Sequence, residues 1–443
     1  MLSPSDKPAN RFRTPVKRRV IMYLGGLSLF CLPQIDVFAA TDTPLTDGAH
    51  TVGLADSRVG YESVSYVTDS KVVIQALGER QPLFELSLNP PMGLPKVTGE
   101  LDPAEIDLGR QLFFDRRLSN NETLSCAMCH IPEQGFTQNE LATPVGHLGK
   151  SVRRNVPSLY NVAFTKDLFL DGRERSLELQ IWSPLLAENE MANESREAVL
   201  AKLASNPRYT ALFAETFDEG LTEWTLGRAL AAYQRALLSG DSPFDRWYFG
   251  DEGSTGRSSG SEGYPALAAR GFAVFQDKGC ASCHRFNDKS ALFTDGQYHN
   301  TGTGYQRAGR ALRPPSVQLA PGVFVVPTVD AETETFTDDG RFEVTGREAD
   351  KWRYRTPSLR NVALTSPYMH DGSIATLERV VAFYAEGGGG DPTQDPRTQS
   401  VQLTESDQEA LVAFLRTLTS SHVDALVSDA RSVTIGERTA GGQ

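Results

Sequence analysis

The pattern Cys-x-x-Cys-His occurs twice in this chain, at Cys126–His130 and at Cys280–His284. Two thiols at this spacing can bond to the two vinyl groups of one porphyrin, and the histidine that follows then lies beneath the iron as its ligand. A single match could arise by chance or belong to a zinc site, but these two matches use four of the five cysteines. The sequence therefore predicts two covalently bound haem c groups. The expected attachment residues are Cys126, Cys129, Cys280 and Cys283, with His130 and His284 as ligands of the two irons.

The first 40 residues have the pattern of a secretory signal peptide. Basic residues at 17–19 precede an apolar run from Val20 to Leu32, and small residues follow at Ala39 and Ala40. A retained membrane anchor is the alternative, although the run is short for a bilayer span. Because c-type haem is attached on the outer side of the bacterial inner membrane, both patterns together predict a periplasmic protein.

Removal of this segment makes the chain more acidic. The segment contains six Lys/Arg and two Asp/Glu, so its loss changes the formal net charge from −12 to −16. A chain this acidic repels a phosphate backbone, and nucleic acid is not an expected partner. The fifth cysteine, Cys31, is lost with the segment, which leaves no cysteine for a disulfide outside the haem motifs.

The remaining sequence predicts a mostly α fold with two cytochrome c-like haem domains in tandem and long loops. After an irregular lead over residues 41–95, helical periodicity begins at Pro103, with Asp102 as its N-cap. A second helical stretch covers about 194–239, and a helix over 266–276 leads into the second motif. The Gly/Ser-rich residues 250–260 have the composition of a linker. The expected divisions are a signal peptide at 1–40, a first domain at 41–245, a linker at 246–262 and a second domain at 263–443.

The two halves repeat one another at an offset of 200 residues. Nine of the sixteen positions from 157 to 172 are identical to their counterparts at 357–372. The helix expected after this segment in the second half carries Tyr384, whose oxygen can bind iron, whereas its counterpart Pro184 has no donor atom. One iron would then be capped and the other open to peroxide. The alternative is that Tyr384 only fills an apolar helix face.

Glu190 lies six residues after Pro184. Heterolytic cleavage of H₂O₂ needs a group that takes a proton from one oxygen and delivers it to the other, and a carboxylate above an open haem can do this. From spacing alone, an exposed loop acid is the alternative interpretation.

Residues 100–420 resemble the bacterial di-haem cytochrome c peroxidase family, which includes the MauG proteins that mature methylamine dehydrogenase. The resemblance rests on both haem motifs and on four further segments: Arg154–Pro157, Phe169–Arg173, Gln180…Pro184…Glu190-Met191 and Tyr368–Gly372. It implies that Gln180, Pro184 and Glu190 face the haem that reacts with peroxide, with Glu190 as the acid–base catalyst. It also implies that Tyr384, rather than Met369, binds the second iron.

The resemblance further implies a structural Ca²⁺ between the haems, held by the side-chain oxygen of Asn155 and the backbone carbonyls of Thr365 and Pro367. His147 lies eight residues before Asn155, where resting family members keep a displaceable ligand on the first haem. A solvated loop histidine is the alternative.

At one position this chain departs from the family. Leu170 occupies the place where members usually have a tryptophan between the haems. Electron sharing between the haems would then need another aromatic residue, such as Trp182, Trp247 or Trp352.

The implied function is a periplasmic peroxidase that reduces H₂O₂ to water at the N-terminal haem. Electrons would enter through the C-terminal haem from a small cytochrome c or cupredoxin. The alternative is a MauG-like enzyme that uses a peroxide-derived high-valent haem to oxidise a side chain of a protein substrate, which Tyr384 favours and Leu170 disfavours. A plain dihaem electron carrier is a third candidate, against which Pro184 argues. A homodimer is compatible with the resemblance.

Overall fold

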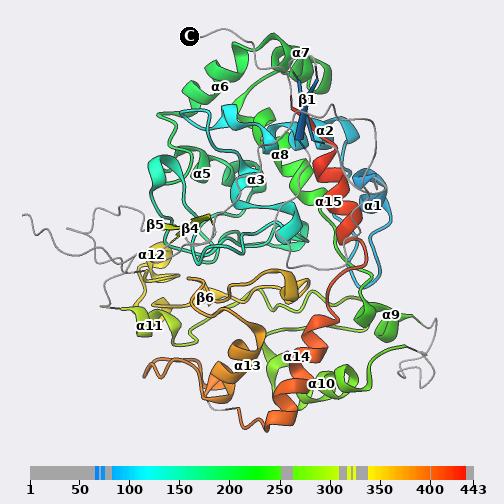
Figure 1. Ribbon diagram of the computed structural model, residues 1–443, viewed down its shortest axis with the longest axis vertical. Helices are drawn as coiled ribbons and strands as arrows, with labels where there is room; N and C mark the ends of the chain where they lie inside the picture. Colours follow the sequence, from blue (N-terminus) through cyan, green and yellow to red (C-terminus); the bar gives the residue numbers. More distant parts are fainter. Residues whose placement is uncertain are drawn as a thin grey trace, which may run out of the picture. The chain divides into compact units, whose positions relative to one another are not determined.

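The computed structural model describes residues 82–250, 263–308, 338–399 and 401–435, together with short strands at 65–68, 71–74, 317–320 and 323–325. Within these ranges the chain is mainly helical with long loops, which confirms the predicted fold class (Figure 1). The expected signal peptide and residues 251–262 of the expected linker lie outside the described residues. None of the helices in the described ranges combines the length and the apolar character that a membrane crossing requires.

Two crossing helices form the centre of the first half, α2 (Pro103–Phe114) and α8 (Glu223–Ala236). Asp102 caps α2 as predicted, because its carboxylate accepts the backbone N–H of Ala104 at 2.7 Å. The helical stretch expected at 194–239 is three helices, α6 (Arg196–Ala204), α7 (Pro207–Thr216) and α8. The breaks fall at Asn206-Pro207, where Asn206 caps a new helix, and at Gly220, whose φ is +64°.

The second half has an equivalent pair of crossing helices, α10 (Ala266–Asp277) and α14 (Glu405–Arg416), and α13 (Leu377–Ala385) packs on α14. The predicted helix at 266–276 is confirmed by α10. A second hydrophobic core surrounds this pair and is rich in phenylalanine. Its fully buried rings include Phe244, Phe272, Phe293 and Phe414.

The remaining elements are short. The helices are α1 (Leu83–Leu88), α3 (Cys126–Cys129), α4 (Leu177–Gln180), α5 (Trp182–Leu186), α9 (Pro243–Phe249), α11 (Thr303–Arg307), α12 (Phe342–Thr345) and α15 (Val423–Arg431). The antiparallel strands are β1 (Ser65–Thr68), β2 (Lys71–Ile74) and β7 (Thr434–Ile435) in one sheet, β3 (Tyr298–His299) with β6 (Tyr354–Arg355), and β4 (Val317–Ala320) with β5 (Val323–Val325). Helix α9 therefore covers residues 246–249 of the expected linker.

A glycine lies at the crossing point of each central helix pair. A Cβ on Gly109 of α2 would lie 1.8 Å from the backbone oxygen of Ala229 in α8. A Cβ on Gly271 of α10 would lie 1.8 Å from the backbone oxygen of Ala410 in α14. Both crossings are thus closer than any side chain allows, and the two halves achieve the same helix packing with the same residue type.

Replacing Gly271 with Ala is expected to lower the free energy of unfolding by about 3 kcal/mol, because the added methyl group must push two buried helices apart. Thermal unfolding followed by circular dichroism measures this effect. On the same helix, Leu267 is 45 % exposed, so Leu267→Ala should change stability by no more than about 0.5 kcal/mol. Equal stabilities of the two variants would show that the crossing can relax.

The 200-residue repeat extends to the backbone. Asn161 and Asn361 both adopt positive φ, at 63° and 58°, and the glycines of the two Asp-Gly pairs have φ of 67° and 64°. The amide N–H of Asn161 donates to the carbonyl of Leu237 at 2.9 Å, and that of Asn361 donates to Leu418 at 3.0 Å. The two halves are therefore copies of one structural unit, as the sequence predicted.

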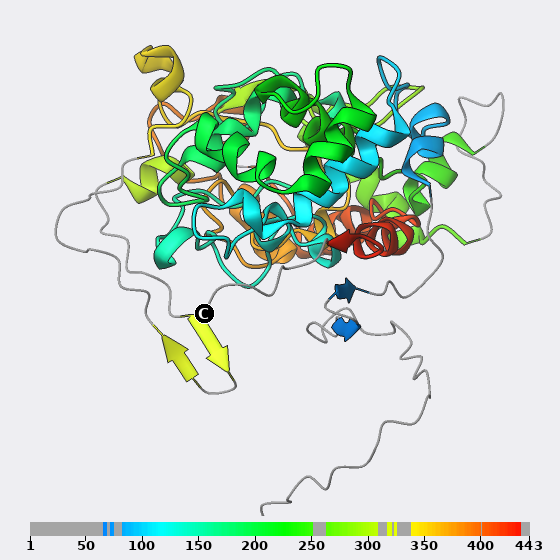
Figure 2. The ribbon, with the colours of Figure 1, turned by 90° about the horizontal axis from the view of Figure 1, so that it is seen from above.

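The end of the described chain returns to the first half. Helix α15, red in Figures 1 and 2, places Leu426 and Ala430 in the first core rather than the second. On the same helix Asp429 forms a buried ion pair with Arg110 of α2 at 2.6 Å. The last residues of the expected second domain thus complete the packing of the first.

Candidate functional site

Each haem motif presents a histidine that is oriented by a backbone carbonyl. His130 follows α3, and its Nδ1 lies 2.9 Å from the carbonyl oxygen of Phe136. His284 follows a 3-10 turn at Cys280–Ser282, and its Nδ1 lies 2.9 Å from that of Phe293. Because a carbonyl can only accept, each Nδ1 must carry the proton, which leaves the lone pair of Nε2 to bind a metal.

The electrostatics of both motifs agree with this role. Burial lowers the pKa of His130 to about 4 and also lowers that of His284, so both rings are neutral at physiological pH. Burial raises the pKa of Cys126 and Cys129 to about 12 and that of Cys280 to about 11, and all four motif cysteines lack a disulfide partner. Neutral imidazoles beside unpaired thiols are the groups that two c-type haems require.

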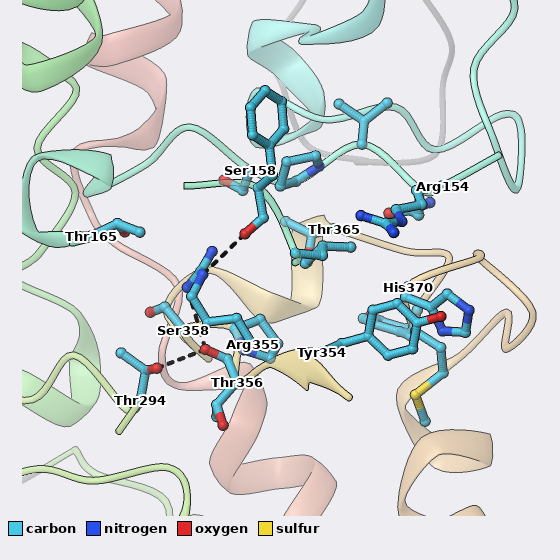
Figure 3. Close-up of a pocket in the computed structure, with 18 of the residues that line it drawn as sticks. Arg154, Ser158, Thr165, Thr294, Tyr354, Arg355, Thr356, Ser358, Thr365 and His370 are labelled. Atoms are coloured by element: carbon cyan, nitrogen blue, oxygen red, sulfur yellow. Dashed lines mark hydrogen bonds between the residues drawn. The ribbon is translucent and has the colours of Figure 1, made fainter. Parts of the chain in front are cut away.

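One cavity of about 870 Å³ connects the two motifs. It is lined by residues of both halves, and Figure 3 shows part of it, where loops of the first half face strand β6 of the second. Both histidines and all four cysteines of the motifs line it. The residues present therefore fit two haems that share one internal space.

The three residues expected to face the first haem lie on two consecutive short helices and the turn after them. Gln180 is the last residue of α4, Pro184 lies in α5, and Glu190 lies in the turn that follows. All three line the cavity together with His130. Burial raises the pKa of Glu190, and the positive charge of Arg173 opposes this shift only in part.

The backbone of Glu190 is fixed by a neighbouring loop. The amide N–H of His147 donates to the Glu190 carbonyl at 2.8 Å. A Cβ on Gly146 would lie 2.8 Å from Glu190 Cα and 2.2 Å from the oxygen of Asn189. Only glycine allows this close approach. Gly146 lines the cavity, but His147 is not among the described residues that do so, and its buried Nδ1 has no hydrogen-bond partner.

The two halves differ in the residue that lines the cavity at positions 184 and 384. Tyr384 lies near the end of α13 and lines the cavity, and burial raises the pKa of its hydroxyl well above the usual range. Pro184, its counterpart at the 200-residue offset, lines the cavity of the first half. Met369, the other candidate ligand, also lines the cavity, from a loop position with φ of 73°. The cavity lining thus includes both candidate ligands of the second iron.

The three residues expected to bind calcium come from both halves of the chain. Asn155, Thr365 and Pro367 all line the cavity. The side-chain Nδ2 of Asn155 donates to the carbonyl of Ala142 at 2.9 Å, which leaves its Oδ1 as an available donor atom for a cation. Neutral oxygens of this kind are ligands that Ca²⁺ accepts.

A charged network that sequence reasoning missed links the two halves beside this cavity. Arg154 of the first half contacts Asp338 of the second at 2.6 Å and Asp171 of its own half at 2.6 Å. Together the two acids hold the pKa of Arg154 above its usual value. The repeat had marked Asp171, but Asp338 lies 184 residues from Arg154 and carries no local signature.

The aromatic residues considered as substitutes for the family tryptophan lie elsewhere. Leu170 lines the cavity, but Trp182 is buried in the first core, and Trp247 and Trp352 pack against other aromatic rings. Among the described residues, none of the three tryptophans lines the cavity. Tyr354 does so, and its ring stacks on His370 with a centroid distance of 3.9 Å (Figure 3).

Comparisons with known proteins cover both halves. The family described as di-haem cytochrome c peroxidase matches residues 103–253, and the family described as cytochrome c matches residues 268–419. The methylamine utilization protein MauG of Methylorubrum extorquens is 36 % identical over 321 residues, which cover 72 % of this chain and 79 % of that protein. Cytochrome-c peroxidase IdrP1 of Denitromonas iodatirespirans is 35 % identical over 357 residues, 77 % of this chain and 89 % of that protein.

A solved structure has the same fold. The crystal structure of a MauG-like protein associated with microbial copper homeostasis aligns with a TM-score of 0.59 and 29 % sequence identity. The alignment covers 77 % of this chain and 96 % of that one. The matched family ranges include both Cys-x-x-Cys-His motifs.

Proposed function

Because the chain belongs to the di-haem cytochrome c peroxidase family, and is therefore an oxidoreductase with two c-type haems, we propose that its two halves have different roles in peroxide reduction. The first haem reduces H₂O₂ to water, and electrons reach it through the second. The observation that carries the proposal is a difference between the two halves at the position expected to lie opposite the histidine ligand of each iron. At equivalent positions, Pro184 offers no ligand atom and Tyr384 offers a phenolic oxygen.

In this proposal Glu190 and Gln180 move a proton of the peroxide and hold the peroxide in place. When bound, the haem supplies the electrons that cleave the O–O bond. The carboxylate of Glu190 accepts a proton from the nearer oxygen and delivers it to the leaving oxygen. The amide of Gln180 orients the peroxide by hydrogen bonding, and the ring of Pro184 leaves room for it. Burial supports this role for Glu190, because a raised pKa brings the carboxyl closer to the pH at which it must both accept and donate.

Spectroscopy of the isolated protein tests the proposed division. We expect one high-spin haem with an open position and one low-spin, six-coordinate haem in the oxidised or the half-reduced protein. Electron paramagnetic resonance and magnetic circular dichroism distinguish these states. Two low-spin haems in both redox states would identify an electron carrier instead.

His147 remains a proposed ligand of the resting first haem. The hydrogen bond from its backbone to the carbonyl of Glu190 supports a second role for the same loop, which is to fix the main chain at Glu190. The spectra described above separate these roles, because His147→Ala changes the spin state of the oxidised first haem only if the imidazole binds it.

We also propose a structural Ca²⁺ held by Asn155, Thr365 and Pro367. Asn155→Ala is expected to weaken calcium binding by at least about tenfold, because it removes a side-chain ligand. Titration with calcium after chelation, followed by thermal unfolding, measures the affinity. Asn287→Ala, at an exposed residue outside the cavity, is the matched control and should bind calcium as the wild type does. Equal affinity of both variants would remove Asn155 from the site.

The setting of the reaction is proposed on the same basis. The chain would be exported to the periplasm, with cleavage of the signal peptide near Ala40. The haem domains would be residues 41–245 and 263–443, and helix α15 of the second domain packs in the first core. A small cytochrome c or cupredoxin would supply electrons, and a homodimer is a further possibility to be tested by sedimentation. These proposals rest on the signal pattern and on family membership.

Oxidation of a protein substrate is the second candidate function, and Tyr384 is the observation that favours it. Binding to ferric iron would remove the phenolic proton that burial otherwise retains. An anionic oxygen ligand stabilises oxidised iron, so the second haem could then store an oxidising equivalent. Addition of peroxide without an electron donor should then give a long-lived oxidised state in the absorption spectrum. Rapid decay with damage to the chain itself would count against this function.

A further inference from the structure

Arg355 is a cavity-lining arginine whose visible partners are all neutral. It lies on β6 at the boundary between the halves and occupies the centre of Figure 3. Its Nε donates to the carbonyl of Phe169 at 3.2 Å, and its Nη1 donates to the carbonyl of Thr356 at 3.4 Å. A guanidinium has five N–H groups, so three of them are not accounted for by these bonds.

Arg355 is half-buried, and the fully buried arginines of the described chain are all paired with carboxylates. Arg360 is 1 % exposed at its side chain and binds Asp245 in a bidentate pair, and Arg110 binds Asp429. For Arg355, no carboxylate of the described residues lies within ion-pair distance. Asp167 influences its pKa, but that carboxylate accepts from Tyr298 at 2.8 Å and pairs with Arg175. Burial lowers the pKa of Arg355, because a guanidinium that is partly shielded from water has no counter-ion here among the described residues. An anion at this position would compensate the charge.

The 200-residue repeat shows which residue of the first half is equivalent to Arg355. The amide N–H of Arg355 donates to the carbonyl of Leu170 at 2.8 Å, and the amide N–H of Asn155 donates to the carbonyl of His370 at 2.7 Å. Both members of the first pair differ from those of the second by 200 residues. Arg355 is therefore the second-half counterpart of Asn155, where a calcium ion is proposed. The fold would then place a positive charge at both equivalent positions, a calcium ion beside Asn155 and the guanidinium of Arg355.

We propose that Arg355 binds a propionate carboxylate of one of the two haems at the boundary between the halves. The cavity must accept two porphyrins, and each haem carries two propionates that lose their water when the halves enclose them. A guanidinium with free N–H groups can bind such a carboxylate in a bidentate pair. The proposal rests on the two haems of the family and not on peroxidase activity.

Redox titration of the loaded protein tests this proposal. Removing a positive charge beside a haem stabilises its oxidised form, so Arg355→Gln should lower the midpoint potential of one haem. We expect a change on the order of tenfold in the reduction equilibrium, which corresponds to about 59 mV for a one-electron couple. Arg353→Gln loses the same charge two residues away, outside the cavity lining, and should leave both potentials within a few millivolts of the wild type. Equal potentials in the two variants would overturn the proposal.

Two further measurements cover the other outcomes. If Arg355→Gln does not retain two haems, Arg355→Lys keeps the charge and loses the bidentate geometry. It should shift the propionate bending band in the resonance Raman spectrum, and an unchanged band would refute the contact. Formate added to the wild type should change neither potential, because the propionate already occupies the guanidinium. A formate-dependent shift that disappears in Arg355→Gln would instead identify a site for free anions and overturn the assignment.

Discussion

Replacing Glu190 with Gln is expected to lower the rate of donor-coupled peroxide reduction by about 10²- to 10⁴-fold, the usual contribution of a positioned proton-transfer group. The substitution keeps the shape of the side chain and the backbone contact with His147, so it removes only the proton-accepting oxygen. Steady-state turnover with a reduced electron donor measures the effect. Glu188→Gln is the matched control, because its side chain is 91 % exposed and pairs only weakly with Lys150, and its turnover should equal that of the wild type.

The same variant has an expected pH signature. Burial raises the pKa of Glu190, and a general base acts only when it is unprotonated. Turnover of the wild type should therefore fall as the pH decreases through this raised pKa and stay level above it. The acid limb should disappear from the small residual rate of Glu190→Gln. Turnover near that of the wild type in this variant would exclude Glu190 from the mechanism.

The second large effect is expected from Tyr384→Phe, which removes the phenolic oxygen from the second distal side and retains the ring. The second haem should change from low-spin to high-spin in the oxidised protein. Its midpoint potential should rise by tens to hundreds of millivolts, within the roughly 0.8 V range that axial ligands span, because an anionic oxygen stabilises the ferric state. Absorption spectroscopy during redox titration measures both changes.

Tyr368→Phe provides the control for this experiment. Tyr368 also lines the cavity, but its hydroxyl donates to the carbonyl of Val362 at 3.0 Å and is not expected to bind iron. If Tyr384→Phe leaves the second haem low-spin, Met369 becomes the candidate ligand. Met369→Leu should then produce the change instead.

The local features of the fold could be predicted from the sequence because they depend on residues close together in the chain. The capping of α2 by Asp102 and the helix before the second motif follow from a few adjacent side chains. The duplication was visible because the repeated segment has kept its backbone conformation, including the positive φ of Asn161 and Asn361. Gln180, Pro184 and Glu190 fall within sixty residues of His130, and they line one cavity with it.

The contacts between the halves could not be predicted in this way. Arg154 and Asp338 are 184 residues apart, and nothing in either neighbourhood indicates that they meet. Arg355 carries no sequence signature, and its place at the boundary follows from the backbone hydrogen bond that it donates to Leu170. The helical stretch expected at 194–239 is three helices, and the breaks at Asn206-Pro207 and Gly220 carry the local signals of a helix start and a positive φ. Long-range pairing of this kind is set by the packing of the complete fold, which a single sequence does not display.

The position of α15 has a consequence for biogenesis. Its residues are the last of the described helices to be synthesised, yet Leu426 and Ala430 fill the interior of the unit that was made first. Until the end of the chain is available, the first core lacks these two side chains, and Arg110 lacks its carboxylate partner Asp429. The first unit can therefore reach its final packing only after the second unit has been synthesised.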